Sequence, residues 1–311
     1  MLMPSMRGPV LLTGVALALT CGCTGSTGTD SRDNSRAGAS SPVIPVVAST
    51  NVYGNIVQQV GGGKVTVVSI ISDPAQDPHS YEASTQNRLE LSKAKVVVEN
   101  GGGYDDFVGR MLHSAKNSSP AVIDAVKVSG KAPKAGRELN EHVWYDLPAM
   151  GKLTDRVADA LAKASPADAD VFRRNAKAFK DRLTALERKE RQVKAEHAGA
   201  AVAVTEPVPL YMTEAMGLRN KTPADFGQAV EEGDDVSAQS LQRTLSLFAH
   251  KQVKALIYNK QTSGPPTEKV KAAAEDSGIP VVPVTETLPQ GEDYLSWMTA
   301  NIGAIKSALE R

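Results

Sequence analysis

Residues 165–196 read SPADADVFRRNAKAFKDRLTALERKERQVKAE and determine how the rest of the chain is organised. Ser165 and Pro166 form a typical helix start, in which a capping side chain is followed by proline at the first helical position. Apolar residues from Val171 to Leu186 recur at helical spacing among charged residues, which predicts one apolar stripe along a solvated helix. We expect one helix of about 30 residues, roughly 45 Å long, that ends before Gly199.

Short β-branched runs alternate with helical patterns on both sides of this segment. Such alternation is typical of mostly parallel sheets with helices on both faces. The sequence therefore predicts an α/β fold of two lobes joined by one long rigid helix, which would limit hinge motion between the lobes. Pro280 and Pro283 indicate that the last strand lies at a sheet edge or that a strand starts there. We expect strands near 46–50, 64–71, 95–99 and 121–124 in the first lobe, and near 200–205, 254–258 and 279–284 in the second.

The beginning of the chain has the features of an export signal and a lipid anchor. Arg7 precedes an apolar run at 10–19, which is too short to span a bilayer but typical of a signal-peptide core. Small residues then precede Cys23, which resembles a bacterial lipobox, although Thr20 stands where leucine is usual. Cys21 is the alternative anchor, and an ordinary secretory peptide with incidental cysteines is the alternative interpretation of the segment.

These observations divide the chain into segments with distinct expected roles. Residues 1–23 are the signal segment and anchor, and the Gly-, Ser- and Thr-rich residues 24–43 are a flexible tether. The N-terminal lobe, the linking helix and the C-terminal lobe are expected at 44–165, 166–197 and 198–311. The division predicts an exported protein, lipid-anchored to the outer face of the cytoplasmic membrane.

The composition argues against several classes of function. The 35 Lys and Arg residues balance 35 Asp and Glu residues, whereas a nucleic-acid-binding surface normally has a basic excess. No cysteine follows Cys23, so a metal site in the body must use His, Asp, Glu or other oxygen ligands. The glycine triplets 61–63 and 101–103 lack the Gly-x-Gly-x-x-Gly spacing and predict tight turns rather than phosphate binding.

Four short motifs contain the candidate functional residues. Asp-Pro-His-Ser-Tyr-Glu at 77–82 follows the second predicted strand, and Asn-Glu-His-Val-Trp-Tyr-Asp at 140–146 precedes the helical region. Glu206 directly follows a predicted strand, and Glu286 follows the last one. Because ligands of open α/β sheets bind beyond the carboxyl ends of the strands, both glutamates lie where a ligand is expected.

The four motifs resemble those of the TroA-like family, the zinc- and manganese-binding lipoproteins of metal ABC importers, over nearly the whole mature chain. Two features depart from the family pattern: Glu286 stands where aspartate is usual, and residues 114–141 lack the His-rich acidic loop of some zinc members. Asp225, Asp234, Asn259 and Gln261 remain alternatives for the fourth ligand, and His113, His197 and His250 receive no role. The metal ligands that the resemblance implies are His79, His142, Glu206 and Glu286.

The resemblance also implies a function. A monomer without enzymatic activity would capture Mn²⁺ or Zn²⁺ as cargo and deliver it to the membrane permease of an ABC importer. Two imidazoles and two carboxylates would neutralise a dication, and the oxygen donor Glu206 in place of histidine favours Mn²⁺. A metal-dependent surface adhesin is one alternative. A metallohydrolase is another, although the sequence has no His-Glu-x-x-His motif.

Overall fold

The computed structural model describes residues 42–73, 81, 84–115, 117, 119–133 and 138–311. The part of the chain from Ser41 to Arg311 is one compact unit. The expected signal segment, both candidate anchor cysteines and most of the tether lie outside the described residues, and so does His79.

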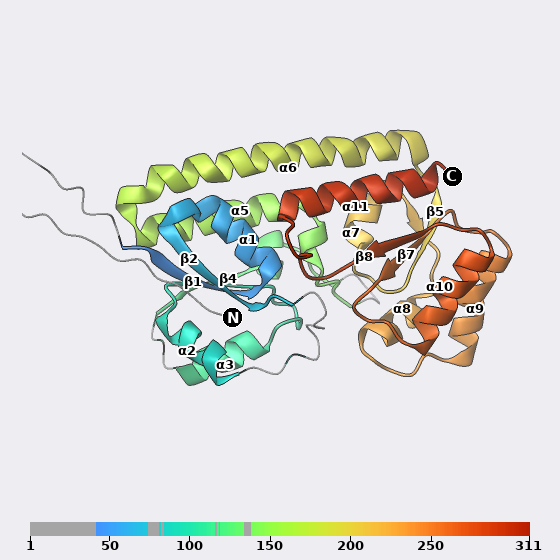
Figure 1. The fold of residues 1–311 in the computed structure, drawn as a ribbon, viewed down its shortest axis with the longest axis horizontal. Helices are drawn as coiled ribbons and strands as arrows, with labels where there is room; N and C mark the ends of the chain where they lie inside the picture. The colour runs from blue at the N-terminus through green and yellow to red at the C-terminus, as the bar shows by residue number, and fades with distance from the viewer. Residues whose placement is uncertain (1–41, 74–80, 82–83, 116, 118, 134–137) are drawn as a thin grey trace, which may run out of the picture. The chain divides into compact units, whose positions relative to one another are not determined.

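The first lobe alternates strands and helices: β1 (Ile44–Thr50), α1 (Asn51–Gly61), β2 (Val65–Ile71), α2 (Thr85–Lys93), β3 (Val96–Glu99), α3 (Phe107–Ala115), β4 (Ala121–Asp124) and α4 (Ala125–Ser129). The strands form a parallel sheet in the order β2-β1-β3-β4 (Figure 1). Neighbouring residues of β1 pack on opposite faces, since Val46 and Val47 belong to different apolar clusters. The sheet is therefore covered on both faces, as its apolar strands predict.

The second lobe repeats this layout: β5 (Ala201–Val204), α7 (Leu210–Ala215), β6 (Arg219–Asn220), α8 (Ala224–Glu231), α9 (Ala238–Ala249), β7 (Leu256–Asn259), α10 (Pro265–Asp276), β8 (Val281–Val284) and α11 (Tyr294–Leu309). Its sheet is also parallel, in the order β6-β5-β7-β8. Strand β8 starts directly after Pro280 and lies at the edge of the sheet, where Pro283 is tolerated because proline has no amide hydrogen for a further strand. The two-residue β6 was not predicted, because so short a strand has no sequence pattern.

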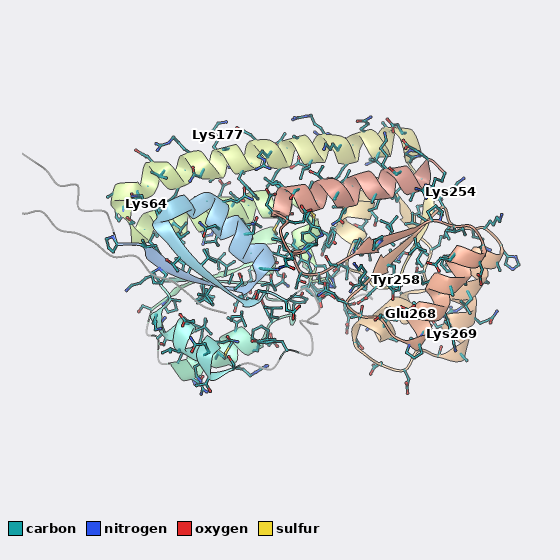
Figure 2. The ribbon with its side chains drawn as sticks, viewed as in Figure 1. Lys64, Lys177, Lys254, Tyr258, Glu268 and Lys269 are labelled. Carbon is teal, nitrogen blue, oxygen red and sulfur yellow. The ribbon has the colours of Figure 1, made fainter. Side chains whose placement is uncertain are left out.

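Two long helices follow the first lobe's sheet: α5 (Leu147–Ala164) packs within the first lobe, and α6 (Ala169–His197) runs along both lobes (Figure 1). Helix α6 has 29 residues and follows a 3₁₀ turn at Pro166–Asp168, so the prediction of one long helix is confirmed. Its start differs in detail, because the Ser165 hydroxyl donates to the Asp168 carboxylate at 2.7 Å rather than capping a backbone N–H. Lys177 projects from the outer side of α6, where it pairs with Asp181 (Figure 2). Among the described residues, no helix is long and apolar enough to cross a membrane.

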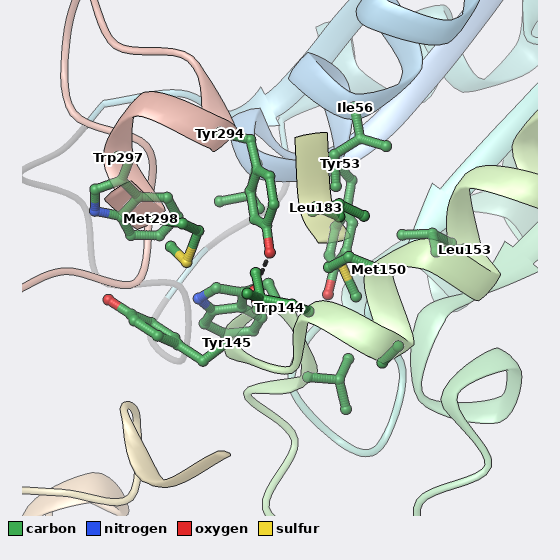
Figure 3. Close-up of a cluster of buried hydrophobic side chains, with 14 of the residues drawn as sticks. Tyr53, Ile56, Trp144, Tyr145, Met150, Leu153, Leu183, Tyr294, Trp297 and Met298 are labelled. Carbon is green, nitrogen blue, oxygen red and sulfur yellow. Dashed lines mark hydrogen bonds between the residues drawn. The ribbon is translucent and has the colours of Figure 1, made fainter. Parts of the chain in front are cut away.

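The inner face of α6 packs into an apolar core that both lobes share. Phe179 and Leu183 of the helix lie in the same cluster as Val46 of the first sheet and Val204 of the second. Figure 3 shows where Tyr53, Trp144 and Tyr145 of the first lobe meet Tyr294 and Trp297 of α11. The Tyr294 hydroxyl donates to the Trp144 carbonyl oxygen at 2.6 Å. The two lobes are therefore joined by buried packing as well as by a helix.

Hydrogen bonds between the lobes add to this restraint. The Asn51 amide donates to the Leu288 carbonyl oxygen and accepts from the Leu288 N–H, both at 2.8 Å. We therefore expect ligand binding to move loops and shift the lobes slightly. Crystal structures with and without ligand would test this expectation, and a large rigid-body rotation of one lobe would contradict it.

A tight glycine turn follows β3 and leads towards the site. Gly101 and Gly102 have φ angles of 76° and 70°, a left-handed backbone that favours glycine. A Cβ atom on Gly101 would lie 2.4 Å from Asp124 Oδ1, so the position also has no room for a side chain. The predicted turn is confirmed, and it is followed at once by Tyr104, whose side chain is buried.

Candidate metal centre

His142 is presented by a buried 3₁₀ turn of the first lobe, Val143–Tyr145, just before α5. Trp144 and Tyr145 anchor this turn in the core, and Asp146 caps α5 by accepting from the Ala149 N–H at 2.8 Å. The imidazole of His142 is fully buried. The position of His142 is therefore set by the packing of Trp144 and Tyr145 in the core and by the start of α5.

Glu286 reaches the same place from the second lobe, two residues after β8. Its backbone N–H donates to Gln261 Oε1 at 2.6 Å, which fixes the loop. Its carboxylate accepts from the Asn259 amide at 2.7 Å and from the Tyr104 hydroxyl at 3.1 Å. Only 1% of Glu286 is exposed, so this carboxylate is held away from solvent by neutral donors from both lobes.

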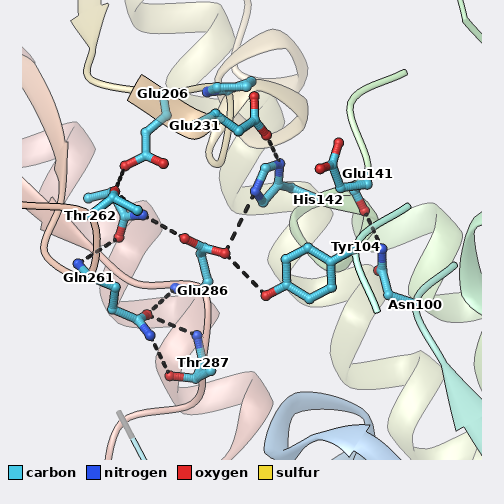
Figure 4. A network of polar contacts seen from close by, with 12 residues as sticks. Asn100, Tyr104, Glu141, His142, Glu206, Glu231, Gln261, Thr262, Glu286 and Thr287 are labelled. Atoms are coloured by element: carbon cyan, nitrogen blue, oxygen red, sulfur yellow. Dashed lines mark hydrogen bonds and ion pairs between the residues drawn. The ribbon is translucent and has the colours of Figure 1, made fainter. Parts of the chain in front are cut away.

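His142 and Glu286 face each other across the boundary between the lobes. His142 Nε2 lies 3.9 Å from Glu286 Oε2 (Figure 4). An imidazole nitrogen and a carboxylate oxygen at this separation can both coordinate one transition-metal ion after a small shift, because metal–ligand bonds to nitrogen and oxygen are about 2.0–2.2 Å long.

Glu206 is joined to Glu286 through a short chain of polar side chains. It follows β5, is 1% exposed, and accepts a hydrogen bond from the Thr262 hydroxyl. Thr262 in turn accepts from the Asn259 amide at 3.0 Å, and the same amide donates to Glu286. Strands β5 and β7 are adjacent although β6 lies between them in sequence, so Glu206 and Asn259 lie at a switch point of the sheet, where ligands are expected.

The four alternatives to Glu286 as the fourth metal ligand either hydrogen-bond Glu286 or lie at exposed positions. Asn259 and Gln261 hydrogen-bond Glu286 itself, the first to its carboxylate and the second to its backbone. Asp225 forms an exposed ion pair with Arg243, and Asp234 is exposed. The histidines without an assigned role are elsewhere: His113 is exposed on α3, His250 is exposed at the end of α9, and His197 ends α6.

Two further carboxyl groups lie beside His142, and sequence reasoning gave neither of them a role. Glu231 Oε1 is 3.5 Å from His142 Nδ1, and donor atoms of Glu141, His142 and Glu231 lie within 4.8 Å of one another. Burial, and then the charges of Glu141 and Glu286, raise the pKa of Glu231 to about 9. Burial raises the pKa of Glu141 to about 7. A dication bound here would oppose both shifts, because it favours the charged carboxylates.

The chain is similar to known proteins over most of its length. Residues 46–308 match the profile of the family described as zinc-uptake complex component A, periplasmic (ZnuA). The manganese-binding lipoprotein MntA of Bacillus subtilis (strain 168) is 27% identical over 274 residues, which cover 86% of this chain and 86% of MntA.

Solved structures share the fold. The solute-binding protein FpvC of Pseudomonas aeruginosa in complex with Mn²⁺ superposes with a TM-score of 0.72 at 22% identity, covering 86% of this chain and 98% of FpvC. A mutant of the laminin-binding adhesin Lmb of Streptococcus agalactiae has a TM-score of 0.73 at 20% identity, covering 86% of this chain and 99% of Lmb. The arrangement of two α/β lobes is therefore shared with these solved structures.

Proposed function

Because the chain belongs to the family of the periplasmic zinc-uptake complex component A, we propose that it captures a divalent transition metal, Mn²⁺ or Zn²⁺, between its lobes and delivers it to an ABC importer. The observation that carries the proposal is the approach of His142 Nε2 and Glu286 Oε2 to 3.9 Å from opposite lobes, with both side chains buried. Burying carboxylates is unfavourable unless their charge is compensated. A dication between the lobes would compensate Glu286 and Glu206 together.

The proposed ligands are His79, His142, Glu206 and Glu286. His142 and Glu286 face each other directly, and Glu206 belongs to the same polar network. His79 is included because of its sequence motif. A coordination sphere filled by protein side chains suits capture, whereas a catalytic metal usually keeps an open position for water. The proposal therefore assigns no catalytic residue to the chain.

The proposal also covers the oligomeric state of the protein, its location and its protein partner. The chain acts as a monomer, is exported, and is held at the outer face of the cytoplasmic membrane by a lipid on Cys23. Its protein partner is the membrane permease of the importer. Support comes from the N-terminal sequence pattern and from relatives such as MntA, which is named a manganese-binding lipoprotein.

A surface adhesin is the second candidate function, favoured by the shared fold with the laminin-binding adhesin Lmb. The fold alone does not separate the two functions. The burial of His142, Glu206 and Glu286 favours ion capture, because these side chains have almost no surface to offer a macromolecule. Surface binding that persists after all four proposed ligands are replaced would favour the adhesin.

Measuring the affinities for Mn²⁺ and Zn²⁺ tests the proposed function. We expect metal-stripped protein to bind one Mn²⁺ or Zn²⁺ per chain in a competitive titration with buffered free metal at one pH. Glu206→His should shift the Zn²⁺/Mn²⁺ affinity ratio towards zinc by about tenfold, because it exchanges a hard oxygen donor for a borderline nitrogen donor. Glu206→Gln keeps the shape, removes the charge, and should weaken binding of both metals.

Glu214→Gln is the matched control, because Glu214 is exposed on α7 in the same region of the chain. It should leave both affinities unchanged. If Glu206→Gln and Glu206→His both bind each metal as the parent does, Glu206 is not a ligand, and the preference for manganese loses its main support.

A further inference from the structure

Asn140 contacts both His142 and the segment that carries Glu206. Its side-chain oxygen Oδ1 accepts from the His142 backbone N–H at 3.0 Å and lies 2.8 Å from His142 Nδ1. Its side-chain nitrogen Nδ2 donates to the carbonyl oxygen of Pro207, the residue after Glu206, at 3.0 Å. The Tyr211 hydroxyl donates to the Asn140 backbone oxygen at 2.6 Å, so the asparagine is tied to the second lobe at two atoms.

These contacts fix which end of the Asn140 amide is oxygen. The backbone N–H of His142 can only donate, so the atom that faces it must accept. The carbonyl oxygen of Pro207 can only accept, so the atom that faces it must donate. Both backbone partners therefore require Oδ1 on the side of His142 and Nδ2 on the side of Pro207.

The orientation of the amide decides the tautomer of His142. An oxygen that is only an acceptor lies 2.8 Å from Nδ1, so the ring makes a hydrogen bond there only if Nδ1 carries the proton. Glu231 Oε1 lies farther from Nδ1, at 3.5 Å, so Asn140 Oδ1 is the nearer of the two oxygens. In a neutral ring with the proton on Nδ1, Nε2 presents its lone pair, and Nε2 is the nitrogen that faces Glu286.

We propose that Asn140 is a positioning residue that keeps the proton of His142 on Nδ1 and thereby presents Nε2 as the metal-binding nitrogen. Its second bond, to Pro207, holds the Glu206 segment beside the same imidazole, so one side chain aligns proposed ligands from both lobes. The effect on affinity rests on the proposed metal-binding function. The tautomer of His142 does not depend on that function, because it is a property of the metal-free protein.

The tautomer can be measured directly in ¹⁵N-labelled, metal-stripped protein by long-range ¹H–¹⁵N correlation of the imidazole rings, of which the chain has five. We expect His142 to show a protonated Nδ1 and an unprotonated Nε2. Asn140→Ala should convert a large part of the population to the other tautomer. Asn140→Asp retains an acceptor oxygen beside Nδ1 and should restore the parent tautomer.

Two controls separate the role of Asn140 from general packing. Glu231→Ala removes the other oxygen near Nδ1 and should leave the tautomer unchanged, because Asn140 is closer. Asn175→Ala removes a comparable bond to a backbone carbonyl, that of Val60, far along the chain, and should also leave it unchanged. The proposal is overturned if parent His142 is protonated on Nε2, if Asn140→Ala keeps the parent tautomer, or if Glu231→Ala changes it instead.

Metal titration of the same variants then tests the consequence. Asn140→Ala should bind Mn²⁺ and Zn²⁺ roughly 10–100-fold more weakly, as is typical when a residue that orients a histidine ligand is lost. Asn140→Asp should recover part of this loss. Unchanged affinity in Asn140→Ala would overturn the link to binding. If the parent binds neither metal, the proposed function fails while the tautomer result stands.

Discussion

Adding Mn²⁺ or Zn²⁺ to metal-stripped protein should raise its melting temperature by roughly 8 °C when the free metal is a thousandfold above the dissociation constant. A ligand that binds only the folded state adds about 4 kcal/mol under that condition, and each kcal/mol raises the melting temperature of a protein of this size by about 2 °C. The size of the rise depends only on the ratio of free metal to the dissociation constant, provided that the metal binds the folded chain alone. Differential scanning calorimetry over a series of metal concentrations would measure it.

His142→Ala should abolish most of this stabilisation, since it removes the buried imidazole that faces Glu286. His113→Ala is the matched control, because His113 is exposed on α3 and receives no role in the proposal. The absence of a shift with either metal, or an equal shift in both variants, would count against metal capture at this site.

Glu190→Gln should stabilise the protein at pH 8 by a few kcal/mol while changing little at pH 4.5. Glu190 is almost fully buried on the inner face of α6, between Leu186 and Val193 of the apolar stripe. Burial, followed by the charges of Glu187 and Asp146, raises the pKa of Glu190 from 4.5 to about 8. Because one pKa unit corresponds to about 1.4 kcal/mol, the shift represents a destabilisation on the order of a few kcal/mol.

The pH dependence has a definite sign. Below about pH 4.5 the carboxyl group is protonated in the folded and the unfolded chain, and it costs nothing in stability. Between about pH 4.5 and pH 8 the unfolded chain releases its proton first, so the free energy of unfolding falls as the pH rises. Glutamine does not titrate, so the advantage of the variant should grow over this range.

Denaturant unfolding of parent and variant at several pH values would measure the difference. Glu275→Gln is the matched control, because Glu275 is exposed near the end of α10 and should give no gain at any pH. A Glu190→Gln variant whose advantage stayed constant from pH 4.5 to pH 8 would contradict the assignment of the effect to a buried, titrating carboxyl group.

Much of the fold was predictable because its signals are local. The apolar stripe of 165–196 and the β-branched strands have the periodicities of their elements, and both lobes follow from their alternation. The two-residue β6 has no such periodicity. Glu190 lies at an apolar position of the stripe, and only the structure shows that it is buried rather than rotated to solvent.

The candidate site was predictable only where motifs or strand ends marked it. His142 lies in a recognisable motif, and Glu206 and Glu286 follow strands, so local sequence signals mark all three residues. Glu231 ends the short helix α8 with no motif around it, and its approach to His142 arises from tertiary packing. Asn140 was quoted within a motif, but its bond to Pro207 joins residues 67 positions apart, which no local pattern reveals.

The most direct test of metal capture is a crystal structure of the metal-loaded protein, with anomalous diffraction recorded on both sides of the manganese and zinc absorption edges. We expect one anomalous peak between the lobes, with His142 Nε2 and carboxylate oxygens of Glu206 and Glu286 at about 2.0–2.2 Å from the ion. A peak confined to another cluster, such as Glu196 and His197 at the end of α6 with Glu310 after α11, or no peak near His142, would contradict the account.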